Sequence, residues 1–356
     1  MMHSQGDIVS GRYEILEFVG QGGMQEVYRA KDRLLSRHVA LKTPKTSSAN
    51  KRFSRSAQTS AKINHSNVAK TLDYIPDQNH PYLIEELVEG CDLNLFLRKM
   101  VSRLDPYACA QVLHHLAKGL AASHHAEVIH RDIKPSNIMV VGGADFLDVK
   151  ITDFGIAKMA QAELDQAVNG GEEALTQSAT ALGALPYMAP EMIESFASAD
   201  KPADVWSLGA MTFELLTGIK PFGSGYRAVP LIQKAIVPPI PTEQTPKTQF
   251  LGLAKEIYAI IKTCLSRDPT DRPTADALVL LCEALCYSDD LREFGTVDRF
   301  NRQEDGFIRC DSGGTVFFHQ KSVPAGKVAV GDRVWFSRHP GEPFHRAFPV
   351  VPSVAR

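Results

Sequence analysis

The most informative stretch of this sequence is His130-Arg131-Asp132-Ile133-Lys134-Pro135-Ser136-Asn137, and a second motif, Asp153-Phe154-Gly155, follows it along the chain. The first stretch places an aspartate, a lysine and an asparagine within one short loop, and the second adds another acidic residue. Phosphoryl transfer requires these residue types: a carboxylate to hold the attacking hydroxyl, a cation beside the moving phosphoryl group, and oxygen ligands for Mg²⁺. Three residues recur by chance, so the first motif alone is weak evidence, whereas the two motifs in this order are specific.

The two motifs closely resemble those of the protein kinase family, and Lys134 is typical of its serine/threonine branch rather than its tyrosine branch. The resemblance implies that Asp132 positions or deprotonates the substrate hydroxyl and that Lys134 contacts the γ-phosphate of ATP. It also implies that Asn137 and Asp153 bind Mg²⁺. In this family the residue at the position of Arg131 usually binds a phosphate on the activation segment, which favours control by phosphorylation.

A glycine-rich stretch lies upstream, and we expect Tyr13–Ala30 to form two strands joined by a tight turn. Alone it would indicate an ordinary hairpin, but with Val39-Ala40-Leu41-Lys42 following at strand spacing it resembles the nucleotide-binding lobe of kinases. The family's third loop glycine is replaced by Gln25, whose side chain could crowd the phosphates or stiffen the loop. The residues that the resemblance assigns to the ATP site are Val19, Gly20, Gln21, Gly22, Gly23, Met24, Gln25, Glu26, Val27, Ala40, Lys42, Glu86, Leu87 and Met139.

The position that normally supplies the carboxylate partner of the ATP-site lysine is occupied by a serine. The helix expected over Lys51–Ile63 has Ser56 at that place, and no acidic residue lies between 50 and 68. Kinases generally require this ion pair in the active state, so its loss argues against efficient catalysis. Glu85, beside the hinge, offers a replacement, because a buried carboxylate needs a cation such as Lys42. The alternative is that the register is displaced by one residue and Glu85 turns to solvent.

The segment from Asp153 to Glu191 corresponds to the activation segment of kinases. Its middle part, 161–180, is long and polar, which suits a loop that becomes ordered when its charge changes. The residues 183–191 resemble the end of the segment, although Ala184 replaces the threonine that usually bonds to the catalytic aspartate and lysine. The resemblance also implies an ion pair between Glu191 and Arg272. The candidate phosphorylation sites are Thr176, Ser178 and Thr180.

From Gly295 onward, short β-prone runs alternate with glycine and polar turns, as in a small barrel. These runs resemble the five strands of a cold-shock domain, which is an OB-type barrel. The part from 294 to 356 has nine Lys and Arg against six Asp and Glu, a net charge of +3 and only a mild basic bias. The expected strands lie at 295–301, 305–309, 316–319, 331–336 and 347–351.

Strand alternation places several rings of this barrel on one face, where cold-shock domains stack single-stranded bases. The surviving candidates are Phe307, Phe317 and His319. Three positions where that family commonly has an aromatic ring hold other residues: Arg299, Asp305 and Gln320. Two readings therefore stay open: the barrel binds single-stranded nucleic acid, or it docks a protein or packs on the kinase part.

We therefore expect an α+β chain with a two-lobed protein kinase fold followed by a small five-stranded β-barrel of the OB or cold-shock type. The expected division is an N-terminal tail over 1–12, a kinase domain over 13–288 and a cold-shock-like domain over 294–356. Because the connection between the last two is short, we expect them to touch. A chain of 356 residues with 44% hydrophobic residues is sufficient for these packed cores.

Composition excludes several other classes of protein. The net charge of −2 gives no whole-chain basic field for nucleic acid or membrane, and no run approaches the roughly 20 apolar residues of a membrane span. The N-terminus lacks the apolar region of a secretory signal. Six cysteines without a regular framework favour a reducing cytoplasm, and we expect Cys282 and Cys286 to be buried thiols rather than metal ligands.

Three functions fit these observations. The leading one is a cytoplasmic serine/threonine protein kinase of bacterial type that uses ATP and Mg²⁺, acts on protein substrates and phosphorylates itself. The second is a pseudokinase or very slow kinase that serves as a scaffold. The departures that favour the second lie at Gln25, Ser56, Glu85 and Ala184, whereas the retained residues that oppose it are Lys42, Asp132, Asn137 and Asp153. A small-molecule kinase is disfavoured by the segment 183–191, which in protein kinases forms a shelf for protein substrates.

Overall fold

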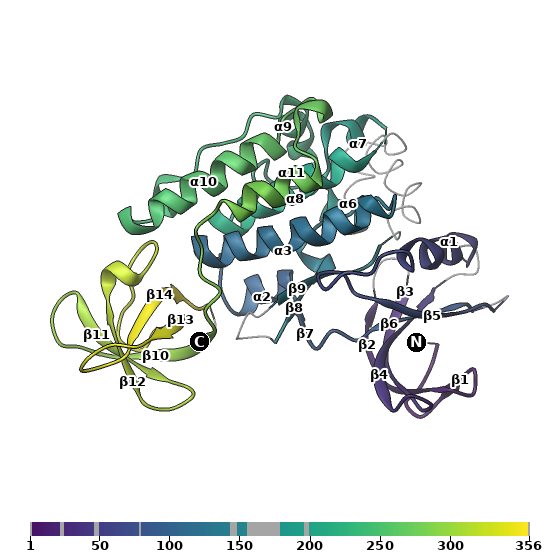
Figure 1. Ribbon diagram of the computed structural model, residues 1–356, viewed down its shortest axis with the longest axis horizontal. Helices are drawn as coiled ribbons and strands as arrows, with labels where there is room; N and C mark the ends of the chain where they lie inside the picture. Colours follow the sequence, from purple (N-terminus) through teal and green to yellow (C-terminus); the bar gives the residue numbers. More distant parts are fainter. Residues whose placement is uncertain are drawn as a thin grey trace.

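The computed structural model describes residues 2–21, 25–45, 50–77, 80–142, 148–154, 179–195 and 199–354. Figure 1 shows an N-terminal sheet with one helix, a central group of helices, and a small C-terminal barrel beside that group. The expected α+β fold, a two-lobed kinase fold followed by a closed five-stranded barrel, is confirmed. Within these residues, no helix combines the length and the apolar character that crossing a membrane would need.

The N-terminal part is a six-stranded antiparallel sheet in the order β1-β2-β3-β4-β6-β5. α1 (Asn50–Ser60) packs on it through Phe53 and Ala57, which contact Leu83. The first residues, expected to be a tail, are attached to the sheet, because β1 pairs with β2 and Met2 N donates to Glu26 Oε2 at 2.9 Å. The strands are β1 (Ile8–Val9), β2 (Tyr13–Gln21), β3 (Gln25–Asp32), β4 (Arg37–Pro44), β5 (Thr71–Ile75) and β6 (Tyr82–Glu86).

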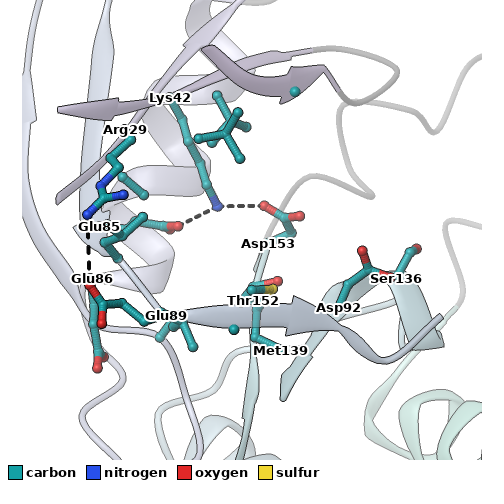
Figure 2. Close-up of a pocket in the computed structure, with 18 of the residues that line it drawn as sticks. Arg29, Lys42, Glu85, Glu86, Glu89, Asp92, Ser136, Met139, Thr152 and Asp153 are labelled. Atoms are coloured by element: carbon teal, nitrogen blue, oxygen red, sulfur yellow. Dashed lines mark hydrogen bonds and ion pairs between the residues drawn. The ribbon is translucent and has the colours of Figure 1, made fainter. Parts of the chain in front are cut away.

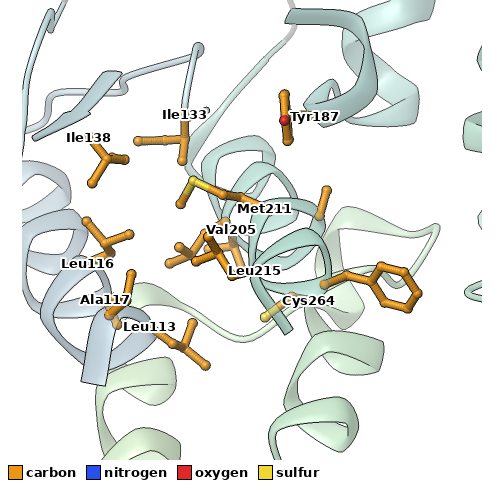
Figure 3. Packing of buried hydrophobic residues seen from close by; sticks show 14 of the residues in the cluster. Leu113, Leu116, Ala117, Ile133, Ile138, Tyr187, Val205, Met211, Leu215 and Cys264 are labelled. Atoms are coloured by element: carbon orange, nitrogen blue, oxygen red, sulfur yellow. The ribbon is translucent and has the colours of Figure 1, made fainter. Parts of the chain in front are cut away.

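The central part is built around two long buried helices, α3 (Pro106–His125) and α8 (Lys201–Thr217). Figure 3 shows side chains of α3 such as Leu116 meeting Val205 and Met211 of α8 in one hydrophobic core. Asp105 caps the N-terminus of α3, because its side chain accepts hydrogen bonds from two backbone N–H groups of the first turn. The other helices are α2 (Leu93–Lys99), α6 (Ala179–Ala184), α7 (Pro190–Glu194), α9 (Val229–Lys234), α10 (Thr248–Cys264) and α11 (Ala275–Glu283).

A three-stranded sheet between these two parts positions the decisive motifs. Its strands, in the order β7 (Gly90–Asp92), β8 (Ile138–Val141) and β9 (Asp148–Ile151), are antiparallel. The stretch 130–137 leads directly into β8, and Asp153 follows β9. Because Ile138 pairs with Ile151, the end of the first motif lies beside the start of the second.

The C-terminal part is a closed barrel in the strand order β10-β11-β12-β14-β13, with β12 and β14 parallel and the other pairs antiparallel. Each of the five runs expected from the sequence overlaps one strand. β10 begins at Arg292, slightly before the expected domain start at 294. The strands are β10 (Arg292–Phe300), β11 (Asp305–Cys310), β12 (Thr315–His319), β13 (Arg333–His339) and β14 (Arg346–Pro352).

The barrel is joined to the helical part by a buried interface. Trp335 of β13 is fully buried in the same core as the helices, with its ring 5.6 Å from that of Phe96 on α2. The Arg292 guanidinium lies 4.4 Å from the Trp335 ring centre and donates to both Asp105 carboxylate oxygens, at 2.6 and 3.1 Å. Asp105 therefore caps α3 and anchors the barrel with one carboxylate. The expected contact between the two parts is present.

All six cysteines are free thiols. Cys282 is buried as expected, but Cys286 is exposed, so the expectation that both are buried was wrong. The reason is that α11 ends at Glu283, so Cys286 no longer follows the buried face of that helix.

Candidate active site

A cleft of about 550 Å³ is lined by residues of the N-terminal sheet and of the small sheet β7–β9 (Figure 2). Its volume is within the range of sites for small molecules and cofactors. Apolar side chains line it from both sides: Val19, Val27 and Ala40 from the N-terminal sheet, and Met139 from β8. The chain 86–90, which connects the two sheets, forms its edge, and includes both residues expected at the hinge.

Lys42 carries its ammonium group into this cleft between two carboxylates. Its Nζ lies 2.5 Å from Glu85 Oε2 and 2.7 Å from Asp153 Oδ1 (Figure 2). The strand register explains the first contact, because Ala40 of β4 lies opposite Glu85 of β6 and Lys42 is two residues along on the same face. Since α1 contains no acidic residue, it supplies no carboxylate to this lysine.

Burial and charge act in opposite directions on these three groups. Burial alone would lower the pKa of the Lys42 ammonium, but Asp153 and Glu85 outweigh it and the pKa is raised. Burial raises the pKa of Glu85, and Lys42 offsets only part of this effect because the Asp153 charge adds to it. Burial would also raise the pKa of Asp153, but Lys42 outweighs it and the pKa is lowered. The lysine is therefore strongly held as a cation, and Asp153 is the more firmly ionised of its two partners.

The loop that follows His130 is held by its own side chains. Asp132 Oδ2 accepts hydrogen bonds from the Lys134 ammonium at 2.7 Å and from Asn137 Nδ2 at 3.0 Å. The backbone carbonyl of Asn137 accepts from Thr152 N at 2.9 Å and from Thr152 Oγ1 at 3.1 Å. Thr152 directly precedes Asp153, so these bonds connect the loop to the carboxylate that faces Lys42.

Asp204 of α8 supports this loop through contacts that the sequence did not predict. Its carboxylate is fully buried and accepts hydrogen bonds from His130 N at 2.9 Å, Arg131 N at 2.7 Å and His124 Nε2 at 3.0 Å. Arg131 has a positive φ of 65°, an uncommon conformation for a non-glycine residue that these bonds hold in place. The pattern around Asp204 indicates a buried helix but does not reveal its partners.

The remaining residues expected at the ATP site fall into three groups. Gly20 lines the cleft, and Gln25 contacts Asp153. Glu26 lies on the other face of β3, where its carboxylate bonds to Tyr28 Oη and Met2 N. Gln21 ends β2, and Gly22, Gly23 and Met24 lie outside the described residues.

The expected features of the activation segment are only partly within the described residues. Thr176 and Ser178 lie outside them, and Thr180 belongs to α6. The expected ion pair at the end of the segment is present, with Arg272 donating to Glu191 through NH1 at 2.6 Å and NH2 at 2.9 Å. Ala184, at the usual threonine position, is buried at the end of α6.

The oxygen atoms at the site suit Mg²⁺. Asp153 Oδ2 accepts no hydrogen bond from the described part of the chain, and the Asn137 side-chain oxygen is left over because its amide nitrogen is engaged. Mg²⁺ commonly takes one or two protein ligands and completes its shell with substrate phosphates and water. The described residues contain no cluster of three His, Cys, Asp or Glu side chains that could hold a metal ion.

A second candidate surface is a row of side chains across four neighbouring barrel strands. Cα partners in this row run from Arg299 on β10 to Phe307 on β11, Phe317 on β12 and Arg346 on β14. The Arg299 guanidinium lies 4.8 Å from the Phe307 ring centre, and the Phe307 and Phe317 rings are 5.9 Å apart. Phe344, which the sequence analysis did not single out, contacts Phe307 at 5.0 Å.

The three predicted stacking residues differ in how accessible they are. Phe307 is only 4% exposed, because Arg299 and the neighbouring rings cover it. His319 lies 3.3 Å from Glu304 and 3.6 Å from Asp305, so its ring is engaged by carboxylates. Phe317 is half-buried, which leaves it and the exposed Phe344 as the accessible rings of this surface.

Comparisons with known proteins agree with this geometry. Residues 13–281 match the family profile described as "Protein kinase domain". The serine/threonine-protein kinase PrkC of Bacillus subtilis is 31% identical over 307 residues, which cover 84% of this chain and 44% of PrkC. The serine/threonine-protein kinase PknL of Mycobacterium tuberculosis is 30% identical over 289 residues, covering 80% of this chain and 67% of PknL.

The similarity concerns part of some longer relatives. The probable serine/threonine-protein kinase PknB of Corynebacterium glutamicum is 33% identical over 282 residues, covering 74% of this chain but 40% of PknB. The chain thus spans less than half the length of PrkC and of this PknB. Among solved structures, Rad53 1–466 in complex with AMP-PNP has a TM-score of 0.57 and 24% identity, covering 75% of this chain and 64% of that one, which supports the fold.

Proposed function

Because the chain belongs to the protein kinase family, we propose that it is a serine/threonine protein kinase, as its relatives PrkC and PknL are named. It transfers the γ-phosphoryl group of ATP to serine and threonine hydroxyls of proteins, including its own. The observation that carries this proposal is one chain of contacts across the cleft. Lys42 bonds to Asp153, Thr152 joins Asp153 to Asn137, and Asn137 bonds to Asp132.

In the mechanism that we propose, Asp132 holds the substrate hydroxyl in line and takes its proton. One of its oxygens is engaged by Lys134 and Asn137, whereas the other accepts no hydrogen bond from the described residues and is available to the hydroxyl. Lys134 lies beside it, where a cation stabilises the negative charge of the moving phosphoryl group. A Mg²⁺ ion held by Asp153 and Asn137 would neutralise charge on the triphosphate.

We assign Lys42 to the α- and β-phosphates and Glu85 to holding Lys42 in place. Two neighbouring strands carry the pair, so its geometry is fixed by the ladder between β4 and β6. The apolar residues Val19, Val27, Ala40 and Met139 would enclose the adenine, and the backbone at Glu86 and Leu87 would bind its edge. Gly20 and the glycine-rich turn would cover the phosphates.

We further propose that phosphorylation of the activation segment controls the enzyme through Arg131. The guanidinium of this residue donates to Ala199 O at 2.9 Å, while its buried Nε has no hydrogen-bond partner within the described residues. A phosphate would supply acceptors for the unused donors. The candidate acceptors of phosphate are Thr176, Ser178 and Thr180, and mass spectrometry of the autophosphorylated chain would identify them.

The proposed activity is tested by incubating the full chain with γ-labelled ATP and Mg²⁺ and analysing the phosphoamino acids. We expect phosphoserine and phosphothreonine without phosphotyrosine, and no label when EDTA removes the metal. A chain that binds ATP but never transfers the label would instead be the scaffold that the departures at Gln25, Ser56, Glu85 and Ala184 suggest.

Because all six cysteines are unpaired, we propose a reducing cytoplasm as its place of action.

A second proposal concerns the barrel, which we infer to be a cold-shock-like domain over 294–356 appended to a kinase domain over 13–288. Its row of Arg299, Phe307, Phe317 and Arg346 supports binding of a short single-stranded nucleic acid, because rings stack bases and arginines neutralise phosphates. His319, the third predicted stacking residue, would contribute only if it left its carboxylate partners.

Binding of oligo-dT and oligo-U at two salt concentrations tests this second proposal. We expect affinity to fall as salt rises, and Phe317→Ala to weaken binding by about 1–3 kcal/mol, the usual value of one stacked base. A matched control is Phe300→Ala, since Phe300 packs against the barrel core instead. No salt-dependent binding by the wild type would leave the barrel as a protein-docking or packing element.

A further inference from the structure

Gln25 stands where the family's ATP-binding loop has its third glycine, and its side chain lies inside the active site. It is the first residue of β3 and is only 3% exposed. Because side chains alternate along a strand, Gln25 lies on the same face as Val27 and Arg29, which both line the cleft. A glycine would leave this space open, so the amide adds two polar groups to the region beside Asp153.

One of these two groups is engaged and the other is not. Gln25 Nε2 donates to Asp153 Oδ1 at 3.1 Å, and the same oxygen accepts from Lys42 Nζ at 2.7 Å. Gln25 Oε1 is buried and has no hydrogen-bond partner within the described residues. A buried acceptor without a donor is unfavourable, and natural proteins rarely leave one unless a ligand or water supplies the donor. Gln25 Oε1 can therefore accept a hydrogen bond from a ligand that binds next to Asp153.

We propose that Gln25 is a metal-positioning residue, whose Oε1 accepts a hydrogen bond from a water molecule on the divalent cation that Asp153 holds. This inference rests on the proposed function, because it requires Asp153 to be the metal-binding carboxylate. Mg²⁺ keeps several of its waters when bound to protein, and these waters are strong donors. Groups that orient a ligand or a bound water in this way tune metal affinity although they do not touch the metal.

The proposal assigns a distinct role to each end of one amide. Nε2 orients the Asp153 carboxylate, and Oε1 orients the hydrated cation, so the two contacts act on the same metal. The replacement of glycine by Gln25 then adds a group that orients the metal, in contrast to the expectation that a side chain here crowds the phosphates. The effect should appear in the dependence of ATP binding on Mg²⁺ rather than in ATP binding itself.

The test is calorimetric titration of the full chain with ATP, in EDTA and over a series of Mg²⁺ concentrations. The variants are Gln25→Gly, which restores the family residue, and Gln25→Leu, which keeps the bulk but removes both polar groups. For both we expect the Mg²⁺ concentration that gives half of the affinity gain to rise about three- to tenfold, the effect of one hydrogen bond. The ATP affinity of each protein in EDTA is the reference against which its own gain with Mg²⁺ is measured.

The outcomes separate this inference from the proposed function. If the wild type responds to Mg²⁺ and both variants need no more Mg²⁺ than it does, the inference is wrong and Gln25 only fills the loop. If the wild type shows no response of ATP affinity to Mg²⁺, the proposed function itself is overturned. Because the two variants differ in size, a shared loss cannot come from a cavity or from crowding, and unchanged melting temperatures without ligand exclude unfolding.

Discussion

The carboxylate partner of Lys42 lies on a strand rather than on a helix, and this difference affects how the pair can move. Glu85 and Lys42 belong to β6 and β4, which are hydrogen-bonded neighbours in one sheet. The two residues therefore move together, and their contact does not depend on where α1 lies. A lysine anchored in this way stays in position in every state of the helix, so regulation is expected to act on the activation segment instead.

The first prediction concerns Glu85→Gln. The change removes the charge beside a buried ammonium but keeps the shape, so Lys42 is drawn towards Asp153 and away from the phosphates. A hydrogen bond to a charged group is worth about 1.5–3 kcal/mol, so we expect kcat/KM for ATP to fall about ten- to a hundredfold. Glu86→Gln is the control, because its carboxylate pairs with Lys150 at 2.9 Å. Equal kinetics for both variants would show that Lys42 is positioned by another group.

For single residues, the sequence indicated which side chains belong to the active site but only partly which contacts hold them in place. Glu85 stood out because a carboxylate next to a buried strand needs a cation, yet a slip of one residue would have turned it to solvent. That choice requires the pairing of Ala40 with Glu85, which no local pattern specifies. Two partners of Asp204 could not be predicted because they are backbone N–H groups of a distant loop, and backbone groups carry no sequence signal.

At the scale of elements, the barrel strands were predictable because each alternates between two faces. In β13, Val334 and Phe336 point into the barrel core, whereas Trp335 between them belongs to the core of the helical part. Alternation predicts two faces but not what covers each of them. Trp335 therefore could not be recognised from the sequence as the residue that joins the two parts.

The second prediction is made for this strand. Trp335→Ala removes a fully buried ring that contacts Phe96 and Arg292, so we expect a loss of about 3–5 kcal/mol in the free energy of unfolding. Phe344→Ala is the matched control, because its ring is 47% exposed and should cost no more than about 1 kcal/mol. Urea unfolding of both variants gives the comparison. Equal losses would mean that the interface contributes little.

At the scale of the whole molecule, the barrel contributes Trp335 and Val351 to the core of the helical part and keeps a second core of its own. Besides the Arg292–Asp105 ion pair, Phe348 of β14 stacks on Phe250 of α10 with ring centres 5.2 Å apart. Lys247 N also donates to Pro324 O at 2.7 Å, which joins the barrel to the start of α10. The short connection between the parts predicted contact but not its extent, because residues far apart in the sequence make it.

The third prediction follows from this shared core and uses the two tryptophans of the chain. Trp206 lies within the helical part on α8, whereas Trp335 of β13 lies at the interface with the barrel, and both are fully buried. Trp206 therefore reports on the helical part and Trp335 on its contact with the barrel. The variants Trp206→Phe and Trp335→Phe each keep one tryptophan. In each variant, we expect the urea midpoint of the tryptophan fluorescence to equal the urea midpoint of the far-ultraviolet circular dichroism. Trp335 fluorescence that changes before the helical signal is lost would contradict a single cooperative unit.

An active kinase is distinguished from a scaffold by single-turnover transfer of labelled phosphate from Mg·ATP, comparing the wild type with Asp132→Asn. A positioned general base contributes about a hundredfold or more, so the variant should bind ATP normally and transfer phosphate at least a hundredfold more slowly. Its melting temperature should stay close to that of the wild type, because Asn can keep the contacts of the loop. Equal transfer rates for the two proteins would show that the loop 130–137 is not where the phosphoryl group moves.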